Sequence, residues 1–358
     1  MSSRRASVFF VVSMAGVGAF ARTGHAHEKW FYDAGPFPTR WETALTLPAG
    51  AAIAAAVAVT IAAWLLWRAC GARDLIPGPQ ALGADETGRA RFYALVPFIV
   101  GIHVGLPLIV LGIQGALFSP SNVLRGAALY WFGVVQIGIG VSLLYGALTR
   151  LAGLALAGLW LAGAGVMGLE PMLESVHVLG FAAFFFMTGR GPYAVDRLLF
   201  PALEPSPGLA KCAMTAVRVA TGASLVAVAL TEKLANQALA VAFLEKYPLN
   251  FTRWLGLPLS DHIFAVCAGG VELLIGLWLV FGLFPRVIIV TAWLFINMTL
   301  TVFNWHELLG HLPIYGAMAV LLIWTPDPED QRLWVRGVLG GDGTMATTPA
   351  RMRAVGRR

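Results

Sequence analysis

The residues of this chain that could do chemistry are histidines and carboxylates near the ends of apolar stretches. Glu174 and His177 form a Glu-x-x-His spacing, which predicts that both side chains share one helical face. Glu307 and His311 lie four residues apart, with His306 beside them. Imidazole and carboxylate together suit iron, copper, zinc or manganese, and helical bundles build metal sites from such spacings. These residues are therefore candidate metal ligands; the competing interpretation, which we favour, is that the side chains are solvated helix ends or interface anchors.

His27 is a further candidate metal ligand. If a signal peptide is removed after Ala26, the free amine and the imidazole of His27 could chelate copper together. Residues 28–31, which follow, are amphipathic and could rest on the membrane surface. The alternative interpretation is a solvated tail whose histidine has no role.

A second group of polar residues lies within apolar stretches or at their ends. An ionisable side chain inside a membrane span is costly, so it usually marks a function or a paired network. His103, Gln136, Glu272 and Lys233 are therefore candidate cofactor-binding residues, with quinone as the candidate cofactor. We expect Lys233 and Glu272 to form a buried ion pair that offsets the desolvation of both groups. For Glu272 the alternative is a proton-handling or quinone-binding role, and His103 could simply be satisfied by a close-packed helix.

The composition predicts a protein that lives in a bilayer. Of the 358 residues, 58% are hydrophobic and only 12% are charged, and the mean hydropathy is +0.73. A water-soluble domain cannot hide that much apolar surface. The net charge of +6 does not indicate nucleic-acid binding, because the basic residues lie between the apolar stretches and in the C-terminal tail.

The chain is expected to begin with a signal peptide, residues 1–26, followed by an external segment, 27–44. Nine apolar stretches after it are long enough to cross a membrane: 45–69, 93–117, 123–148, 151–169, 173–189, 209–231, 262–284, 286–304 and 308–325. Arginine and lysine are more frequent in every second connection. By the positive-inside rule, the N-terminus is periplasmic and the basic tail, 328–358, is cytoplasmic, in a bacterial inner membrane.

An internal repeat divides most of these stretches into two units of four helices, 93–190 and 209–327. Six residues recur at a constant offset of 136: Gly133, Val135, Gly140, Leu143, Gly146 and Arg150 correspond to Gly269, Val271, Gly276, Leu279, Gly282 and Arg286. Because four helices return the chain to the same side, both units have the same orientation in the membrane. The predicted fold is an all-α polytopic bundle of two parallel repeats plus one extra N-terminal transmembrane helix, 45–69.

The second unit resembles the DoxX family of four-helix membrane proteins. The resemblance rests on the segment 231–234 (Thr-Glu-Lys-Leu), the segment 271–276 around Glu272, the later Gly282 and Arg286, and a closing helix near His311. The first unit is similar more weakly, with Gln114 and Gln136 at the positions of the lysine and the glutamate. The family takes its name from a subunit of a terminal quinol oxidase and thiosulfate:quinone oxidoreductase, which implies an association with redox chemistry and quinones.

These observations favour a redox-associated membrane subunit that binds a quinone or a metal, copper or iron, near its periplasmic face. Its partners would be the lipid bilayer and a periplasmic or membrane redox protein. The first alternative is a non-enzymatic accessory protein that handles copper or another metal for a periplasmic partner. The second is a small-solute transporter, which the repeats suggest but which no charged central pathway supports. No catalytic residue is assigned.

Overall fold

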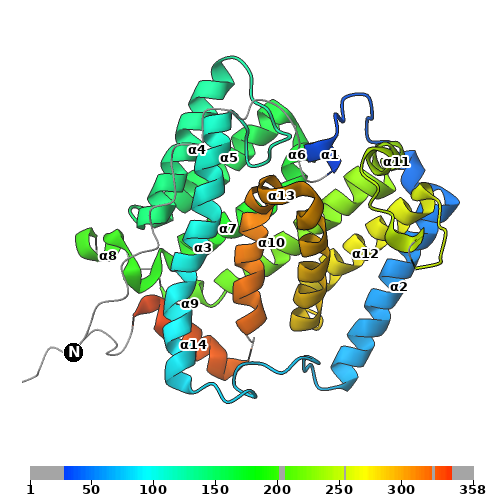
Figure 1. Cartoon of the computed structure of the whole chain (residues 1–358). Coiled ribbons are helices and arrows are strands. Elements are labelled where there is room, and N and C mark those ends of the chain that lie inside the picture. Colours follow the sequence, from blue (N-terminus) through cyan, green and yellow to red (C-terminus); the bar gives the residue numbers. More distant parts are fainter. Residues whose placement is uncertain (1–27, 201–205, 254, 325–326, 341–358) are drawn as a thin grey trace, which may run out of the picture.

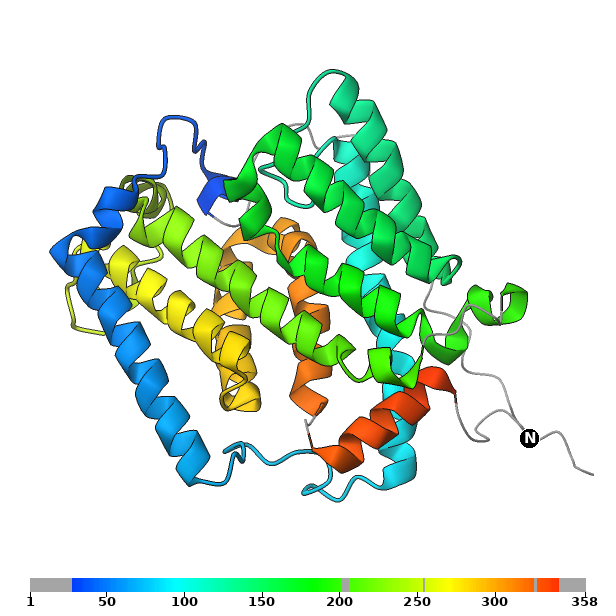
Figure 2. The same cartoon turned by 180° about the vertical axis from the view of Figure 1, so that it is seen from behind.

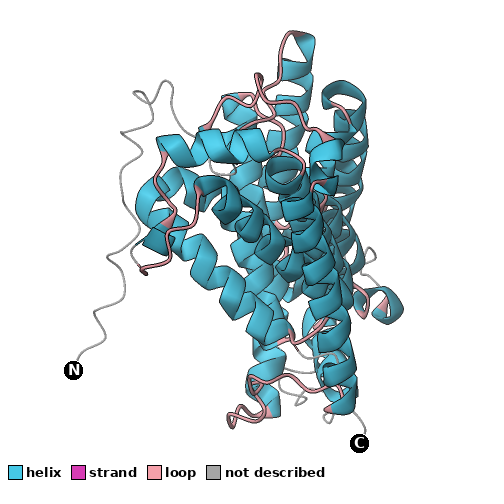
Figure 3. Ribbon diagram, turned by 90° about the vertical axis from the view of Figure 1, so that its right-hand side faces the viewer, coloured by secondary structure: helices cyan, strands magenta, loops and turns pink. Residues whose placement is uncertain are grey.

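The computed structural model describes residues 28–200, 206–253, 255–324 and 327–340. Within these ranges the protein is helical and contains no β-strand (Figures 1 and 3). Its elements are α1 (Glu28–Phe31), η2 (Trp41–Leu45), α2 (Leu47–Ala69), α3 (Glu86–Gln114), α4 (Ala127–Tyr145), α5 (Thr149–Met167), α6 (Leu169–Glu174), α7 (His177–Thr188), η3 (Gly191–Tyr193), α8 (Val195–Leu199), α9 (Pro207–Ala210), α10 (Ala213–Val228), η5 (Ala229–Leu234), α11 (Gln237–Lys246), η6 (Phe251–Arg253), α12 (Asp261–Phe281), α13 (Pro285–Ile323) and α14 (Pro328–Leu339).

Six helical segments of the described chain are long and apolar enough to cross a membrane: α2, α3, α4, α5, α12 and the continuous segment Pro207–Leu234. Three shorter apolar helical segments, His177–Thr188, Pro285–Leu300 and Glu307–Ile323, occupy the remaining predicted spans. Helices that keep their backbone bonds internal are the structures that such sequences adopt in lipid. The chain is therefore a multi-pass integral membrane protein, as its composition predicts.

Helix α13 contains the last two of these segments. Its backbone is helical throughout, yet Figure 1 shows it reversing direction between a first limb, 285–300, and a second limb, 307–323. The reversal lets one continuous helical stretch supply two antiparallel apolar segments. This arrangement agrees with the two separate spans predicted from the sequence.

Glycines allow the helices of each unit to cross at close range. A Cβ atom on Gly140 would lie 2.7 Å from the carbonyl oxygen of Gly105, where α3 crosses α4. A Cβ atom on Gly276 would lie 2.8 Å from the carbonyl oxygen of Gly222, where α10 crosses α12. Small residues are what permits such backbone contact in lipid. Gly140 and Gly276 are also equivalent in the internal repeat, so the two units share this crossing.

The same correspondence holds where α4 and α12 end. Gly146 and Gly282 both have a φ of +70° and terminate their helices in the left-handed conformation. Two residues later, Leu148 and Phe284 have φ values of 54° and 41° and precede the next helix. Glycine adopts a positive φ without the steric cost that a side chain brings. The backbone geometry is thus repeated at the offset found in the sequence.

Alanine at Gly140 should destabilise the protein, whereas alanine at Gly138, on the same helix, should not. Gly138 has open space around its Cβ position, so its replacement gains about 0.5–1 kcal/mol of helix propensity. At Gly140 the added methyl must displace the backbone of α3, at a cost of about 1–3 kcal/mol. Melting temperatures of the two purified variants in one detergent measure the difference. Equal melting temperatures would contradict the close crossing.

The two units meet where α10 packs beside α7 and α13 packs beside α3 (Figures 1 and 2). Helix α2 lies outside both units, against α12, and α14 packs across the beginning of α3. Arg89 on α3 forms ion pairs with Asp330 and Glu329 on α14, which fixes that helix at one end of the bundle. Helix α1 lies at the other end, near α6 and α11 (Figure 1).

Candidate functional site

An open cavity of about 460 Å³ lies in the second unit, bordered by α10, η5, α11, α12 and both limbs of α13. Most of its wall is apolar, including Phe243, Phe264, Ile275, Phe295, Ile314 and Met318. Its polar side chains are few: Glu28, Thr221, Lys233, Thr252, Glu272, Thr299, Glu307 and His311. A concave apolar site with a small number of polar groups is the usual form of a small-molecule binding site.

Lys233 and Glu272 form the predicted ion pair, with 3.0 Å between Nζ and Oε2. A second carboxylate, that of Glu28, lies 3.7 Å from the same Nζ atom. Lys233 stands on η5, a π-helical turn that continues α10. Such turns are rare and often occur at functional sites. The ammonium group of Lys233 thus faces two carboxylates on the wall of an apolar cavity. No sequence pattern had indicated the second carboxylate, that of Glu28.

Helix α1 closes one side of this cavity. The ring of Phe31 stacks on Phe303 with 3.6 Å between centroids, and the ring of Trp30 lies 5.3 Å from that of His311. Glu28, Trp30 and Phe31 are all buried. The sequence allowed these residues to rest on the membrane surface; the structure instead packs them between the helices of the second unit, because their rings find aromatic partners there.

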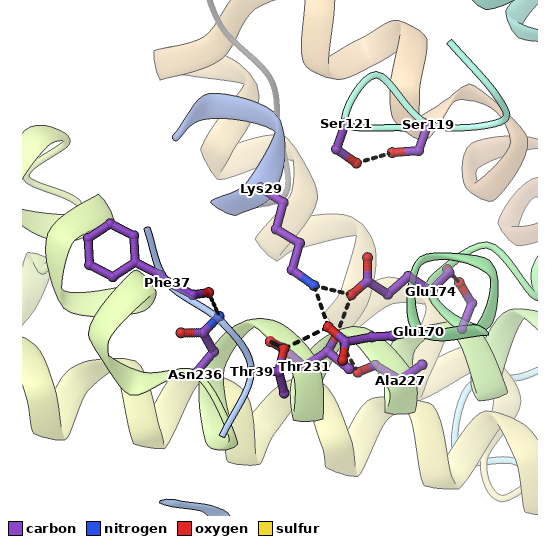
Figure 4. Close-up of polar contacts among 11 residues, drawn as sticks. Lys29, Phe37, Thr39, Ser119, Ser121, Glu170, Glu174, Ala227, Thr231 and Asn236 are labelled. Carbon is purple, nitrogen blue, oxygen red and sulfur yellow. Dashed lines mark hydrogen bonds and ion pairs between the residues drawn. The ribbon is translucent and has the colours of Figure 1, made fainter. Parts of the chain in front are cut away.

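Lys29 points away from the cavity, toward the first unit (Figure 4). Its Nζ atom lies 3.1 Å from Glu170 Oε1 and also contacts Glu174, both on α6. The hydroxyl of Thr231 donates a hydrogen bond of 2.6 Å to the same Glu174 carboxylate. Burial opposes the charge of Lys29, but the surrounding carboxylates raise its pKa above the usual value. Two consecutive residues of α1 therefore contact different units: Glu28 contacts the second unit and Lys29 the first.

Glu28 is one group of this site that titrates near neutral pH. Burial raises the pKa of Glu28 to about 7, against the opposing effect of Lys233, and the carboxylate of Glu272 adds to the rise. A carboxyl group in that range can both hold and release a proton at physiological pH. Glu28 is thus a candidate proton-exchanging group of the cavity.

Glu307 and His311 reach the cavity from α13. Glu307 Oε1 lies 3.6 Å from Nδ1 of His311, and the hydroxyl of Thr299 donates to the same carboxylate. Both residues are buried. The predicted pairing of these two side chains is therefore present, on the side of the cavity where Trp30 covers His311.

Two of the four predicted cofactor-binding residues lie elsewhere. His103 is on α3, where its Nδ1 atom contacts the carbonyl oxygen of Ile99 at 2.8 Å. Gln136 is fully buried in the first unit and bonds to three backbone groups, those of Leu108, Ala116 and Phe118. Neither lines the cavity. Lys233 and Glu272 are the predicted pair that the fold brings together there.

The predicted metal ligands do not converge in the described part of the chain. Glu174 ends α6 and His177 begins α7, so a break separates them and they do not share one helix as predicted. The Nδ1 atom of His177 lies 3.0 Å from the hydroxyl of Ser224. No group of three or more His, Cys, Asp or Glu side chains that could hold a metal ion occurs among the described residues. His27 and the side chain of His306 lie outside the described residues, so their part of the prediction stays a prediction.

Sequence reasoning did not identify Glu28 and Trp30 as part of a site. The available signal was their pattern: an acidic, a basic and two aromatic residues in succession, beginning two positions after the end of the expected signal peptide. An aromatic pair with adjacent opposite charges has the composition of a buried contact as well as that of an interfacial helix. Only the positions of the partner residues in the folded chain distinguish a buried contact from an interfacial helix.

No family model, curated protein or solved structure matches this chain.

Proposed function

We propose that this protein is a DoxX-like membrane subunit of a redox system that binds a quinone in the cavity of its second unit. The observation that carries the proposal is the cavity itself: apolar over most of its wall, about 460 Å³ in volume, and bordered by an ammonium group, three carboxyl groups and an imidazole. A quinone needs an apolar environment for its ring and tail and polar groups for its two oxygen atoms.

The polar groups have the chemistry that quinone binding requires. The ammonium of Lys233 and the imidazole of His311 can donate hydrogen bonds to carbonyl oxygens. Reduction of a quinone by two electrons takes up two protons, and oxidation of the quinol releases them. Glu28, with a pKa of about 7, is placed to exchange such a proton. The electrons would come from, or pass to, a partner redox protein.

The resemblance to the DoxX family supports the same site. The lysine and the glutamate on which that resemblance rests, Lys233 and Glu272, are the two residues of the ion pair on the cavity wall. In the first unit, the glutamine equivalent to Glu272 is Gln136, which bonds to the backbone groups of Leu108, Ala116 and Phe118. We therefore assign the binding role to the second unit, and we place α1 on the periplasmic side.

Quinone binding should be measurable on the purified protein and sensitive to filling the cavity. Ala268 lines the cavity, so phenylalanine at this position should weaken binding of decylubiquinone at least tenfold. The matched control is the same substitution at Ala58, an exposed residue of α2. Binding is followed by quenching of tryptophan fluorescence, and bound quinone is extracted and quantified by chromatography.

Fluorescence quenching by added quinone and extraction of copurified quinone each test the proposal. Quinone that copurifies with the wild type and the Ala58→Phe variant, but is lost from Ala268→Phe, would support the proposal. A wild-type preparation that contains no quinone and does not bind added decylubiquinone or menadione would refute it. A preparation that instead carries stoichiometric copper or iron would favour the metal-handling alternative.

A further inference from the structure

A second cavity, of about 240 Å³, lies at the far end of the first unit from α1. It is bordered by the beginning of α5, the end of α7, the turn η3, helix α8 and the end of α14. Helix α5 leads from this cavity to α6, which contacts Lys29, and its 19 residues span about 28 Å. This second cavity and the polar end of the first one, at Glu28 and Lys233, therefore lie near opposite ends of the bundle. The proposed quinone site uses only the first cavity.

Three arginines border this second cavity, Arg150, Arg190 and Arg197, against one carboxylate, that of Asp196. The carboxylate is already engaged, because its oxygens accept hydrogen bonds from the backbone N–H groups of Leu148 and Thr149 at 2.5 and 2.8 Å. Asp196 thus caps the start of α5. The cavity carries a net formal charge of +2 and favours an anion.

Arg190 is the most deeply buried of these arginines. Its Nε and Nη2 atoms donate to the carbonyl oxygens of Leu143 and Leu144 at 2.7 and 3.0 Å, and its guanidinium lies 4.4 Å above the ring of Phe98. Its Nη1 atom is buried and has no hydrogen-bond partner among the described residues. Burial lowers the pKa of Arg190 to about 10. A nearby anion would offset the cost of this desolvated charge.

The rim of the same cavity is apolar and exposed. Leu151 and Leu154 on α5 and Phe200 after α8 all have 43–55% of their surface exposed. Leu198 and Leu199 on α8 are 83% and 58% exposed. Helix α8 projects from the other helices in Figure 1. An exposed apolar patch of this kind marks a surface suited to contact with a membrane, so we take these side chains to face acyl chains beside the cationic cavity.

From this combination we propose that the cavity binds the phosphate of an anionic phospholipid. The arginines hold the headgroup phosphate, since guanidinium groups bind phosphate oxygens in pairs, and the rim residues contact the acyl chains. A free phosphate ion would use the arginines alone and would gain nothing from the exposed leucines. The ligand class is therefore a phospholipid with a net negative headgroup, such as phosphatidylglycerol, rather than a soluble phosphate.

The test is native mass spectrometry of the full protein, delipidated in detergent, with added phosphatidylglycerol, phosphatidylcholine or inorganic phosphate. Phosphatidylglycerol should bind more tightly than phosphatidylcholine, and inorganic phosphate should not displace it. Each arginine contributes about fivefold to the affinity for an anionic lipid. The double variant Arg150→Gln/Arg197→Gln should therefore bind phosphatidylglycerol on the order of 25-fold more weakly. The matched control replaces two exposed arginines at the end of α2 and after it, Arg68→Gln with Arg73→Gln.

Three results would overturn the proposal: equal binding of the two lipids, equal binding by the double variant and its control, or displacement by inorganic phosphate. The last would indicate a soluble anion. Melting temperatures without lipid establish that both double variants are folded. If the double variant Arg150→Gln/Arg197→Gln does not fold, the single variant Arg197→Gln, on the projecting helix α8, replaces it in the test. Its affinity for phosphatidylglycerol should fall about fivefold.

Discussion

Replacing Lys233 with methionine should destabilise the folded protein by up to about 3 kcal/mol, because its ion pair with Glu272 is half-buried rather than fully buried. Methionine keeps the apolar stem of the side chain and removes only the ammonium group, so that the nearby carboxyl groups of Glu28 and Glu272 lose their shared cation. Breaking a buried pair by removing one partner leaves an uncompensated charge, which is the costly outcome. Unfolding in a mixed detergent, followed by circular dichroism, measures the free energy of unfolding.

The matched control for this substitution is Lys211→Met, because Lys211 is exposed. Adding Glu272→Gln to Lys233→Met should recover part of the loss, because it removes one of the two carboxylates left without a cation. A Lys233→Met variant as stable as the Lys211→Met control would show that the cavity wall does not depend on this cation. A double variant whose loss equals the sum of the single losses would show that the pair does not interact.

The stability of the protein should fall as the pH rises from about 4.5 to about 7, and Glu28→Gln should make that fall smaller. The pKa of Glu28 is raised by burial from 4.5 to about 7 in the folded state, with Lys233 opposing the rise and Glu272 adding to it. Between these values the folded state binds more protons than the unfolded state, so ionisation destabilises the folded state. The contribution of Glu28 is about 3 kcal/mol, present below pH 4.5 and lost above pH 7.

Melting temperatures across pH 4 to 8 measure this dependence for the wild type and for Glu28→Gln. The control is Glu42→Gln, which removes an exposed carboxyl group of the same N-terminal segment and should leave the pH profile unchanged. Lys29, Lys233 and Glu272 are the charged groups that act on Glu28, and they are present in all three proteins. A Glu28→Gln profile that coincides with that of the wild type would place the titrating group elsewhere.

Much of the fold could be predicted because hydrophobicity and glycine spacing are local properties. Each predicted span corresponds to a helix or to one limb of α13, since roughly 20 apolar residues must satisfy their own backbone in lipid. The offset of 136 residues reappears as the glycine crossings at Gly140 and Gly276 and as the left-handed helix ends at Gly146 and Gly282. The pairing of Lys233 with Glu272 followed from the cost of burying either charge alone.

The site could be predicted only in part, because its geometry depends on which helices meet. His103 and Gln136 look like Glu272 in sequence, as polar groups inside apolar spans, yet they bond to backbone groups of the first unit and line no part of the cavity. Glu174 and His177 have the spacing of one helical face, but the chain turns between them. Spacing predicts a shared face only where the helix is continuous.

The sequence by itself determined that this chain crosses a membrane many times, and it predicted two similar units and the pairing of Lys233 with Glu272. Only the tertiary structure decided that α1 inserts beside that pair, that Glu28 faces Lys233, and that an apolar cavity opens among the helices. Helix formation in lipid depends on residues a few positions apart, whereas these contacts join residue 28 to residues more than 200 positions away. Such long-range contacts arise from the packing of whole helices, which no local pattern records.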